Sequence, residues 1–252
     1  MPPSPVAASP KVLGLLQKLH AASLAQESTW STRLFFLARK IRSAFSSRET
    51  WTSQQDDFTR DKFIALEQDK SEFLYLLART TGATTIVEAG TSFGVSTIYL
   101  ALAAGQNAAS LSSTPVTPGQ GAKVVATEKE PTKAARAREH WKEAGAEVEP
   151  WITLLEGDLN ETLPVEVGKS DKIDLLLLDI WTPLALPALK IVQPKLRHGA
   201  LIVADNTAGF RAAYKDFFEY VHDSKNGFKS MTTPFKGGLE VIVYLPTSEN
   251  QL

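Results

Sequence analysis

Acidic side chains stand at the ends of five predicted strands, and carboxylates in such places bind cofactors or cations. These residues are Glu88, Glu128, Asp158, Asp179 and the pair Asp205-Asn206. In an open parallel sheet, ligands bind outside the carboxyl ends of the strands. A single acid there is readily explained as a helix cap. Five strand ends that present acids to one edge instead predict a binding site.

Glu88 leads into a glycine turn and a helix, with the sequence VEAGTSFGVSTIYL. Gly90 and Gly94 allow the backbone to turn sharply and to approach a ligand. Ser96 and the free amides of the first helical turn are suited to an anionic group. Phe93 inside the turn would crowd a pyrophosphate, which argues against a dinucleotide. A glycine loop that serves only helix packing remains the structural alternative.

Glu88 and Glu128 indicate the class of cofactor. An acid beside the first strand suits a cofactor with a cation, and S-adenosylmethionine (SAM) carries both an ammonium and a sulfonium group. At the tip of the second strand, Glu128 is placed to accept hydrogen bonds from ribose hydroxyls. It lies further from the glycine turn than usual because a predicted loop insertion, residues 106–121, intervenes. A helix-capping role for Glu128 ahead of Pro131 is the alternative.

A second group of strand-end residues has the composition of a metal site. Asp179, Asp205 and Asn206 offer three oxygen ligands without histidine or cysteine. Such a set suits a hard cation such as Mg2+, with waters or substrate oxygens completing an octahedron. The chain has four histidines, and none lies at a predicted strand tip. A histidine base or a catalytic triad is therefore not indicated.

Composition and charge exclude several other classes of protein. The chain has 252 residues, a formal net charge of -1 and 22% charged residues, so nothing indicates a nucleic-acid partner. It has no cysteine, and hence neither disulfides nor thiolate metal sites. No apolar run reaches the roughly 18 residues that span a membrane. We expect a cytoplasmic protein. The alternative is organelle targeting, because the basic stretch up to Arg48 contains one acid, Glu27.

The order of the predicted elements gives a doubly wound α/β sheet that positions these acids. Strands are expected at 85–88, 123–128, 151–155, 173–178 and 200–204, followed by an antiparallel pair at 228–234 and 239–245. Helical patterns are expected at 11–26, 30–46, 58–80, 96–104, 132–145, 184–196 and 210–223.

The chain is expected to form one main domain, residues 56–252, with additions at its N-terminus. Residues 1–10 are proline-rich and are predicted to be disordered. Residues 11–55 are predicted to form a helical extension that covers the active site or contacts a dimer partner. In the second case the protein is a homodimer joined through these helices.

From about residue 63 to residue 245 the chain resembles a known family of enzymes. The matching stretches are VEAGTSFGVSTIYLA, VVATEKEP, LLEGDLNETL, IDLLLLDIW, GALIVADN and GGLEVIVY. They resemble the class I SAM-dependent O-methyltransferases of the cation-dependent catechol and caffeoyl-CoA type, including their microbial relatives. The resemblance implies a seven-stranded, mostly parallel Rossmann-like sheet with an antiparallel C-terminal strand.

The resemblance also implies roles for single residues. It places the methionine part of SAM on Glu88, Gly90 and Ser96, its ribose on Glu128 and its adenine beside Asp158. It makes Asp179, Asp205 and Asn206 the ligands of a divalent metal, with Asp179 facing both the cofactor and the acceptor. It makes Trp181 an aromatic wall of the site and Glu240 an acid that grips a substrate hydroxyl.

One departure from the family pattern concerns the catalytic base. Related enzymes commonly have Asp-x-Trp-Lys after the fourth strand, and the lysine takes the proton of the attacking hydroxyl. Here the sequence is Asp179-Ile180-Trp181-Thr182. Threonine does not accept that proton near neutral pH. Either the metal acidifies the acceptor enough by itself, or another group such as Lys236 substitutes, or the reaction differs.

We therefore expect methyl transfer from SAM to a hydroxyl of a small aromatic acceptor, assisted by Mg2+ or a similar cation. The first alternative keeps the fold and the cofactor but transfers the methyl group without a metal to nitrogen or sulfur, or performs another reaction. A second is a non-catalytic binding protein that uses its basic N-terminal helices. A nucleotide-dependent dehydrogenase is disfavoured by Phe93.

Overall fold

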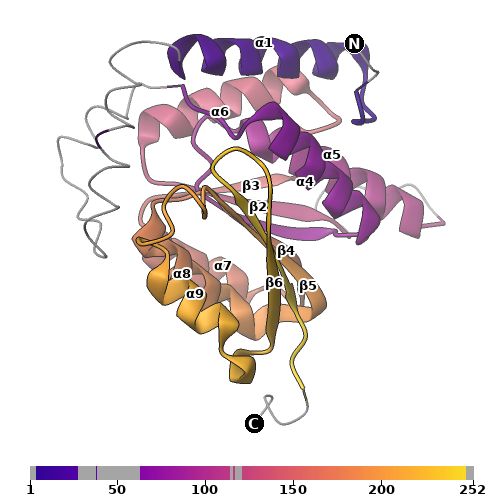
Figure 1. The fold of residues 1–252 in the computed structure, drawn as a ribbon. Helices are drawn as coiled ribbons and strands as arrows, with labels where there is room; N and C mark the ends of the chain where they lie inside the picture. The colour runs from indigo at the N-terminus through magenta and orange to yellow at the C-terminus, as the bar shows by residue number, and fades with distance from the viewer. Residues whose placement is uncertain (1–3, 28–37, 39–62, 114–115, 117–120, 248–252) are drawn as a thin grey trace.

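Seven strands form one sheet in the computed structural model, which describes residues 4–27, 38, 63–113, 116 and 121–247. The strand order is β3-β2-β1-β4-β5-β7-β6 (Figure 1). The strands are β1 (Thr85–Ala89), β2 (Lys123–Glu128), β3 (Ile152–Glu156), β4 (Ile173–Leu178), β5 (Leu196–Asp205), β6 (Phe228–Thr233) and β7 (Leu239–Tyr244). Strands β1 to β5 are parallel, and β7 is antiparallel to both β5 and β6. This arrangement confirms the predicted doubly wound fold.

Helices cover both faces of the sheet, so the central strands are buried on both sides. One layer contains α1, α4, α5 and α6, and the other contains α7, α8 and α9 (Figure 1). The helices are α1 (Pro10–Glu27), α4 (Gln68–Thr80), α5 (Val95–Leu111), α6 (Pro131–Ala144), α7 (Leu159–Gly168), α8 (Thr182–Val192) and α9 (Lys215–His222). Within the described part of the chain, no helix is both long and apolar enough to cross a membrane.

The register of β4 and β5 decides where two of the strand-end acids point. Leu177 pairs with Val203, and both side chains belong to the core under α4 and α5. Side chains alternate between the faces of a sheet. Asp179 and Asp205 each lie two residues further along, so both carboxylates turn toward the α4 side of the sheet.

The N-terminal segment differs from its prediction. Residues 4–9 lie against the body of the protein, although we expected residues 1–10 to be disordered. Val6 is buried, the Ala7 amide donates to the Tyr75 hydroxyl at 3.3 Å, and the Ala7 carbonyl accepts from Gln106 at 2.6 Å. Tertiary hydrogen bonds and one buried valine thus order a segment whose composition alone favours disorder. The helix predicted at 11–26 is confirmed as α1, whereas the one predicted at 30–46 lies outside the described residues, apart from Ala38.

Two further boundaries differ from their predictions. The pattern over 58–80 predicts one helix, but α4 begins only at Gln68, and residues 63–67 are not helical. Side chains of α1 hold this segment extended, since the Phe63 amide donates to Gln26 and the Ala65 amide donates to Ser23. The predicted loop insertion at 106–121 begins late, because α5 continues to Leu111.

Candidate functional site

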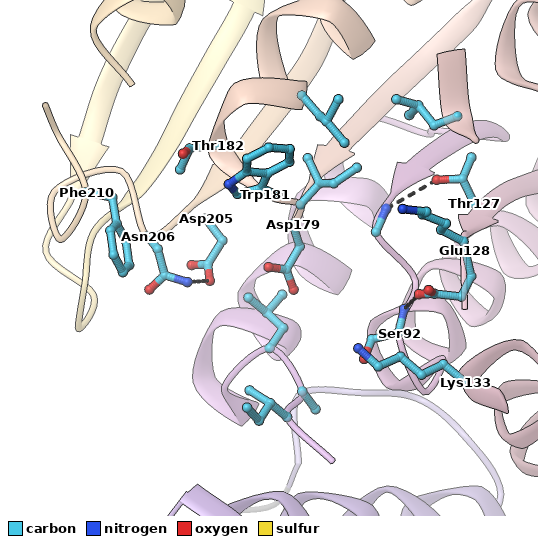
Figure 2. Close-up of a pocket in the computed structure, with 18 of the residues that line it drawn as sticks. Ser92, Thr127, Glu128, Lys133, Asp179, Trp181, Thr182, Asp205, Asn206 and Phe210 are labelled. Carbon is cyan, nitrogen blue, oxygen red and sulfur yellow. Dashed lines mark hydrogen bonds between the residues drawn. The ribbon is translucent and has the colours of Figure 1, made fainter. Parts of the chain in front are cut away.

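A cavity of about 980 Å3 opens at the carboxyl ends of the parallel strands. It lies where the chain order reverses between β1 and β4, which is the usual binding position in doubly wound sheets. Its lining has a polar end next to β2 and an acidic end next to β5 (Figure 2). The polar end is lined by Gly90, Ser92, Thr127, Glu128, Lys133 and Asp158. The acidic end is lined by Glu67, Asp179, Trp181, Thr182, Asp205, Asn206, Phe210 and Lys236.

Gly90 brings the two ends of the cavity together. Its φ is 95°, and a Cβ added there would lie 2.1 Å from the Asp179 carbonyl oxygen. The Asp179 amide donates to the Ala89 carbonyl at 3.0 Å, so the chain after β4 lies directly against the turn after β1. The close approach at Gly90, which the sequence predicted toward a ligand, is made by the backbone of Asp179.

Gly94 serves packing. An added Cβ would lie 2.5 Å from the Trp141 ring nitrogen, which donates to the Gly94 carbonyl at 2.9 Å. The alternative that the turn serves helix packing is thus true of this second glycine, which does not line the cavity.

Glu88 and Ser96 lie beneath the turn. Glu88 is fully buried and accepts hydrogen bonds from three hydroxyls, those of Thr91, Ser96 and Thr97, at 2.8, 2.6 and 2.5 Å. Burial raises the pKa of the Glu88 carboxyl, and these three hydrogen bonds oppose the shift. Neither Glu88 nor Ser96 lines the cavity, so the structure places both behind its wall.

Glu128 faces the cavity at the tip of β2, as predicted for the acid that meets a ribose. One carboxylate oxygen accepts from the Ser92 amide at 2.7 Å and the other from the Glu130 amide at 2.8 Å (Figure 2). Burial raises the pKa of this carboxyl, while the backbone amides and Lys133 oppose the shift. The Lys129 amide also donates to this carboxylate, which lines the cavity and can there meet a ligand hydroxyl.

Asp158 forms the next part of the wall and caps α7. Its side chain accepts from the Asn160 amide at 2.8 Å. Asp158 thus caps α7, whereas Glu128 accepts from the amide of Glu130, the residue just before α6.

Asp179, Asp205 and Asn206 lie together at the acidic end, as the sequence predicted (Figure 2). Burial raises the pKa of Asp179 well above its usual range, and the neighbouring charges of Asp205 and Glu88 add to the shift. Burial also raises the pKa of Asp205, to about 6, against the opposing effect of a lysine, Lys70. Without that lysine, several carboxyl groups would share a poorly hydrated space.

Lys70 is the residue at this end that sequence reasoning missed. It comes from α4, its side chain is 0% exposed, and its ammonium lies 2.6 Å from Asp205 Oδ1 and 2.9 Å from Glu67 Oε2. Burial lowers its pKa, but the charges and hydrogen bonds of Asp205 and Glu67 outweigh this effect and raise it overall. Lys70 is therefore an ammonium at neutral pH. Its position on the same stripe of α4 as Leu74 and Leu77 was the available signal.

These contacts decide whether the three predicted metal ligands fit a divalent cation. Both Asp205 oxygens are engaged, one by Lys70 and the other by the Asn206 side-chain amide at 2.5 Å. The Asn206 oxygen instead lies against Gly237, where an added Cβ would be 2.6 Å away. Among the described residues, no three His, Cys, Asp or Glu side chains are grouped to hold a metal. The donor set does not fit a divalent cation while Lys70 is in place.

The size of the conflict follows from Coulomb's law. A dication held by Asp205 would lie about 4 Å from the Lys70 ammonium, and their repulsion is about 8 kcal/mol at an effective dielectric constant of about 20. Such a cation would have to overcome this repulsion through its attraction to Asp179, Asp205 and Glu67, or displace Lys70 from its buried position.

The remaining predicted residues are divided between the cavity and its surroundings. Trp181, Thr182 and Lys236 line the cavity, and Thr182 is the first residue of α8. Glu240 does not line it. Glu240 is buried in β7, where its carboxylate accepts a hydrogen bond of 2.5 Å from Thr232 on β6. It pairs with Ala204, one residue before Asp205, and so its side chain points to the opposite face of the sheet.

Comparison with known proteins identifies the domain. Residues 87–207 match the family model described as a methyltransferase domain. The chain is 32% identical over 143 residues to a catechol O-methyltransferase of Mycobacterium tuberculosis, an alignment that covers 57% of each protein. The chain thus spans little more than half the length of that relative.

Two solved structures share the fold. The O-methyltransferase TomG of Streptomyces achromogenes, in complex with SAM, superposes with a TM-score of 0.59 at 20% identity, covering 77% of this chain and 87% of that one. An O-methyltransferase of Bacillus cereus, in complex with S-adenosylhomocysteine (SAH), gives 0.59 at 18% identity, covering 91% and 99%. Residues 87–207 thus resemble a methyltransferase domain, and the chain shares the fold of these two structures. The resemblance to O-methyltransferases of the catechol and caffeoyl-CoA type is thereby confirmed.

Proposed function

We propose that this protein transfers a methyl group from SAM to a hydroxyl of a small, aromatic acceptor. The observation that carries the proposal is the single cavity with Glu128 at one end and Asp179 beside Trp181 at the other. The similarity to a catechol O-methyltransferase and to SAM-bound and SAH-bound relatives supports the same donor and the same kind of acceptor atom.

The chain mainly supplies binding and alignment. Glu128 binds the ribose hydroxyls from the cavity wall, and Asp158 with Leu159 and Asn160 surrounds the adenine end. When bound, SAM supplies a methyl group whose bond to sulfur breaks as the bond to the acceptor oxygen forms. Holding the two reactants in line converts the encounter into an intramolecular step. Trp181 and Phe210 give the acceptor end the aromatic walls that suit a flat ring.

The resemblance and the geometry of the site disagree about a divalent cation. Resemblance to the cation-dependent enzymes favours Mg2+ on Asp179, Asp205 and Asn206. The geometry favours the metal-independent alternative, because Lys70 donates to one oxygen of Asp205 and the Asn206 side-chain amide donates to the other. Lys236 lines the same end of the cavity and is the proposed substitute for the missing lysine at position 182.

The N-terminal extension is proposed to complete the acceptor end. Leu24 of α1 lines the cavity, although its side chain is largely exposed to solvent. The cavity is also lined by Ile64, Ala65 and Leu66. An apolar side chain at a cavity mouth suits a covering role better than a purely structural one.

Two measurements test the proposal. Calorimetric titration with SAM and SAH should show one site per chain, and transfer of labelled methyl from SAM to a panel of hydroxylated aromatic compounds should give a methyl ether. Amine and thiol analogues of the same compounds form the control panel. Absence of SAM binding would rule out the proposal, and methylation of amines or thiols alone would favour the alternative reaction.

A further inference from the structure

Lys70 is an ammonium built into the acidic end of the cavity. It is fully buried, and its two hydrogen-bond partners, Asp205 and Glu67, both line the cavity. Lys70 itself does not line the cavity, so the carboxylates separate its charge from the space that a ligand would fill. The lysine therefore neutralises the acids from behind.

The position of Lys70 is set by two elements that meet only in the folded protein. It projects from the first turn of α4, 135 residues away in sequence from Asp205. Residues 63–65, just before α4, are held by Ser23 and Gln26 of α1. Asp205 is oriented by the Asn206 amide on its second oxygen, while its backbone carbonyl accepts from the Tyr214 hydroxyl at 3.0 Å.

We propose that the Lys70 ammonium is the resident cation of this site and takes the place that a divalent metal has in the cation-dependent relatives. Asp205 accepts a hydrogen bond from the ammonium on one oxygen and from the Asn206 side-chain amide on the other. Removal of the Lys70 charge leaves Asp179, Asp205 and Glu67 without their cation and creates a site for a divalent ion.

The inference also accounts for two unusual lysine positions together. Enzymes of the catechol and caffeoyl-CoA type commonly carry a lysine after Asp-x-Trp, where this chain has Thr182. In this chain Lys70 lies inside the acid cluster. Because Lys70 acts through Asp205 and Asp179, it is a positioning residue in the proposed reaction, and it is not placed to touch the acceptor.

Binding of Mn2+, followed by electron paramagnetic resonance and by calorimetry, tests the inference on the purified protein. The wild type is expected to show no saturable binding at millimolar Mn2+. Lys70→Met is expected to bind one Mn2+ per chain, at least about tenfold more tightly than the wild type. Adding Asp205→Asn to this variant should abolish the new site.

A matched control separates a specific site from a general change in charge. Lys133→Met removes one lysine from the other end of the same cavity and should leave Mn2+ binding unchanged. Lys70→Gln provides a second, polar variant if Lys70→Met does not fold, and circular dichroism reports the fold of each.

Either of two results would overturn the inference. One is saturable Mn2+ binding by the wild type that is lost in Asp205→Asn, since a metal would then be the resident cation. The other is a folded Lys70 variant that gains no Mn2+ site. The inference deepens the proposed function and depends on it only for its consequence in catalysis. Mn2+ binding is measured without SAM or acceptor, so failure of the proposed function and failure of this inference are distinguishable.

Discussion

The two ends of the cavity neutralise their acids in different ways. At the β2 end, Glu128 accepts hydrogen bonds from the amides of Ser92 and Glu130, which are neutral donors. At the β5 end, Asp205 accepts a hydrogen bond from the Lys70 ammonium, which carries a full positive charge. Neutral donors satisfy a carboxylate without cancelling its charge, whereas an ammonium cancels it.

The difference assigns each end a different kind of ligand. At the polar end Glu128 is held by backbone amides with the Lys133 charge nearby, and this end lies near the place proposed for the cofactor. The acidic end already contains the Lys70 ammonium and therefore suits an acceptor that carries no positive charge. Four experiments test this difference between the two ends of the cavity.

Removal of Asp205 should have the largest effect on stability. Asp205→Ala leaves the buried Lys70 ammonium with Glu67 alone, and breaking such a buried pair costs about 3–5 kcal/mol. Urea unfolding followed by fluorescence measures the loss. Lys70→Met with Asp205→Leu in one chain should lose much less than the sum of the single changes, because no unpaired charge remains. Additive losses would mean that the two groups do not interact.

Substitution of Gly90 should separate the two ends physically. An alanine there adds a Cβ within 2.1 Å of the Asp179 carbonyl, at a φ of 95°. Gly82→Ala is the matched control, since φ is 63° and no atom lies within 4 Å of the added Cβ. The control should lose about 1–2 kcal/mol from left-handed backbone strain alone. Gly90→Ala should lose more, because backbone must move, and equal losses in urea unfolding would contradict the close contact.

Removal of Glu128 should weaken binding of SAM and SAH. Loss of a charge-assisted hydrogen bond to ribose costs about 1.5–3 kcal/mol, or roughly 10-fold to 150-fold in Kd. Glu156→Ala is the control, because Glu156 pairs with Glu128 in the sheet at the same edge but does not line the cavity. Calorimetry should show weak binding by Glu128→Ala and normal binding by Glu156→Ala. Normal binding by Glu128→Ala together with weak binding by Glu156→Ala would show that Glu128 does not contact the cofactor.

Removal of divalent metal should have the smallest effect. If Lys70 is the resident cation, methyl transfer in excess chelator should stay within about twofold of that with added Mg2+. The same assay on Lys70→Met should become sensitive to chelator. If the wild type loses activity in chelator and regains it with Mg2+, the reaction requires a metal and Lys70 is not the resident cation.

Local patterns predicted most of the fold and the edge of the sheet at which the cavity opens. The run IDLLLL before Asp179 and the glycine turn after Glu88 each lie within about ten residues, and such short-range patterns determine where strands, turns and helices occur. The same patterns placed Glu128, Asp158, Asp179 and Asp205 at one sheet edge. They did not show that α4 begins at Gln68, because side chains of α1 decide the conformation before it.

The class of fold, the sheet edge at which the cavity opens and the identity of the strand-end acids could all be predicted from the sequence, since each depends on neighbours close in the chain. The contacts of those acids could not, because they arise from packing between distant elements. Glu88 lies behind the wall, Glu240 points to the opposite face, and Lys70 on a distant helix meets Asp205. A charge pair separated by 135 residues leaves no periodic signal in the chain, because it exists only after the sheet and α4 have packed together.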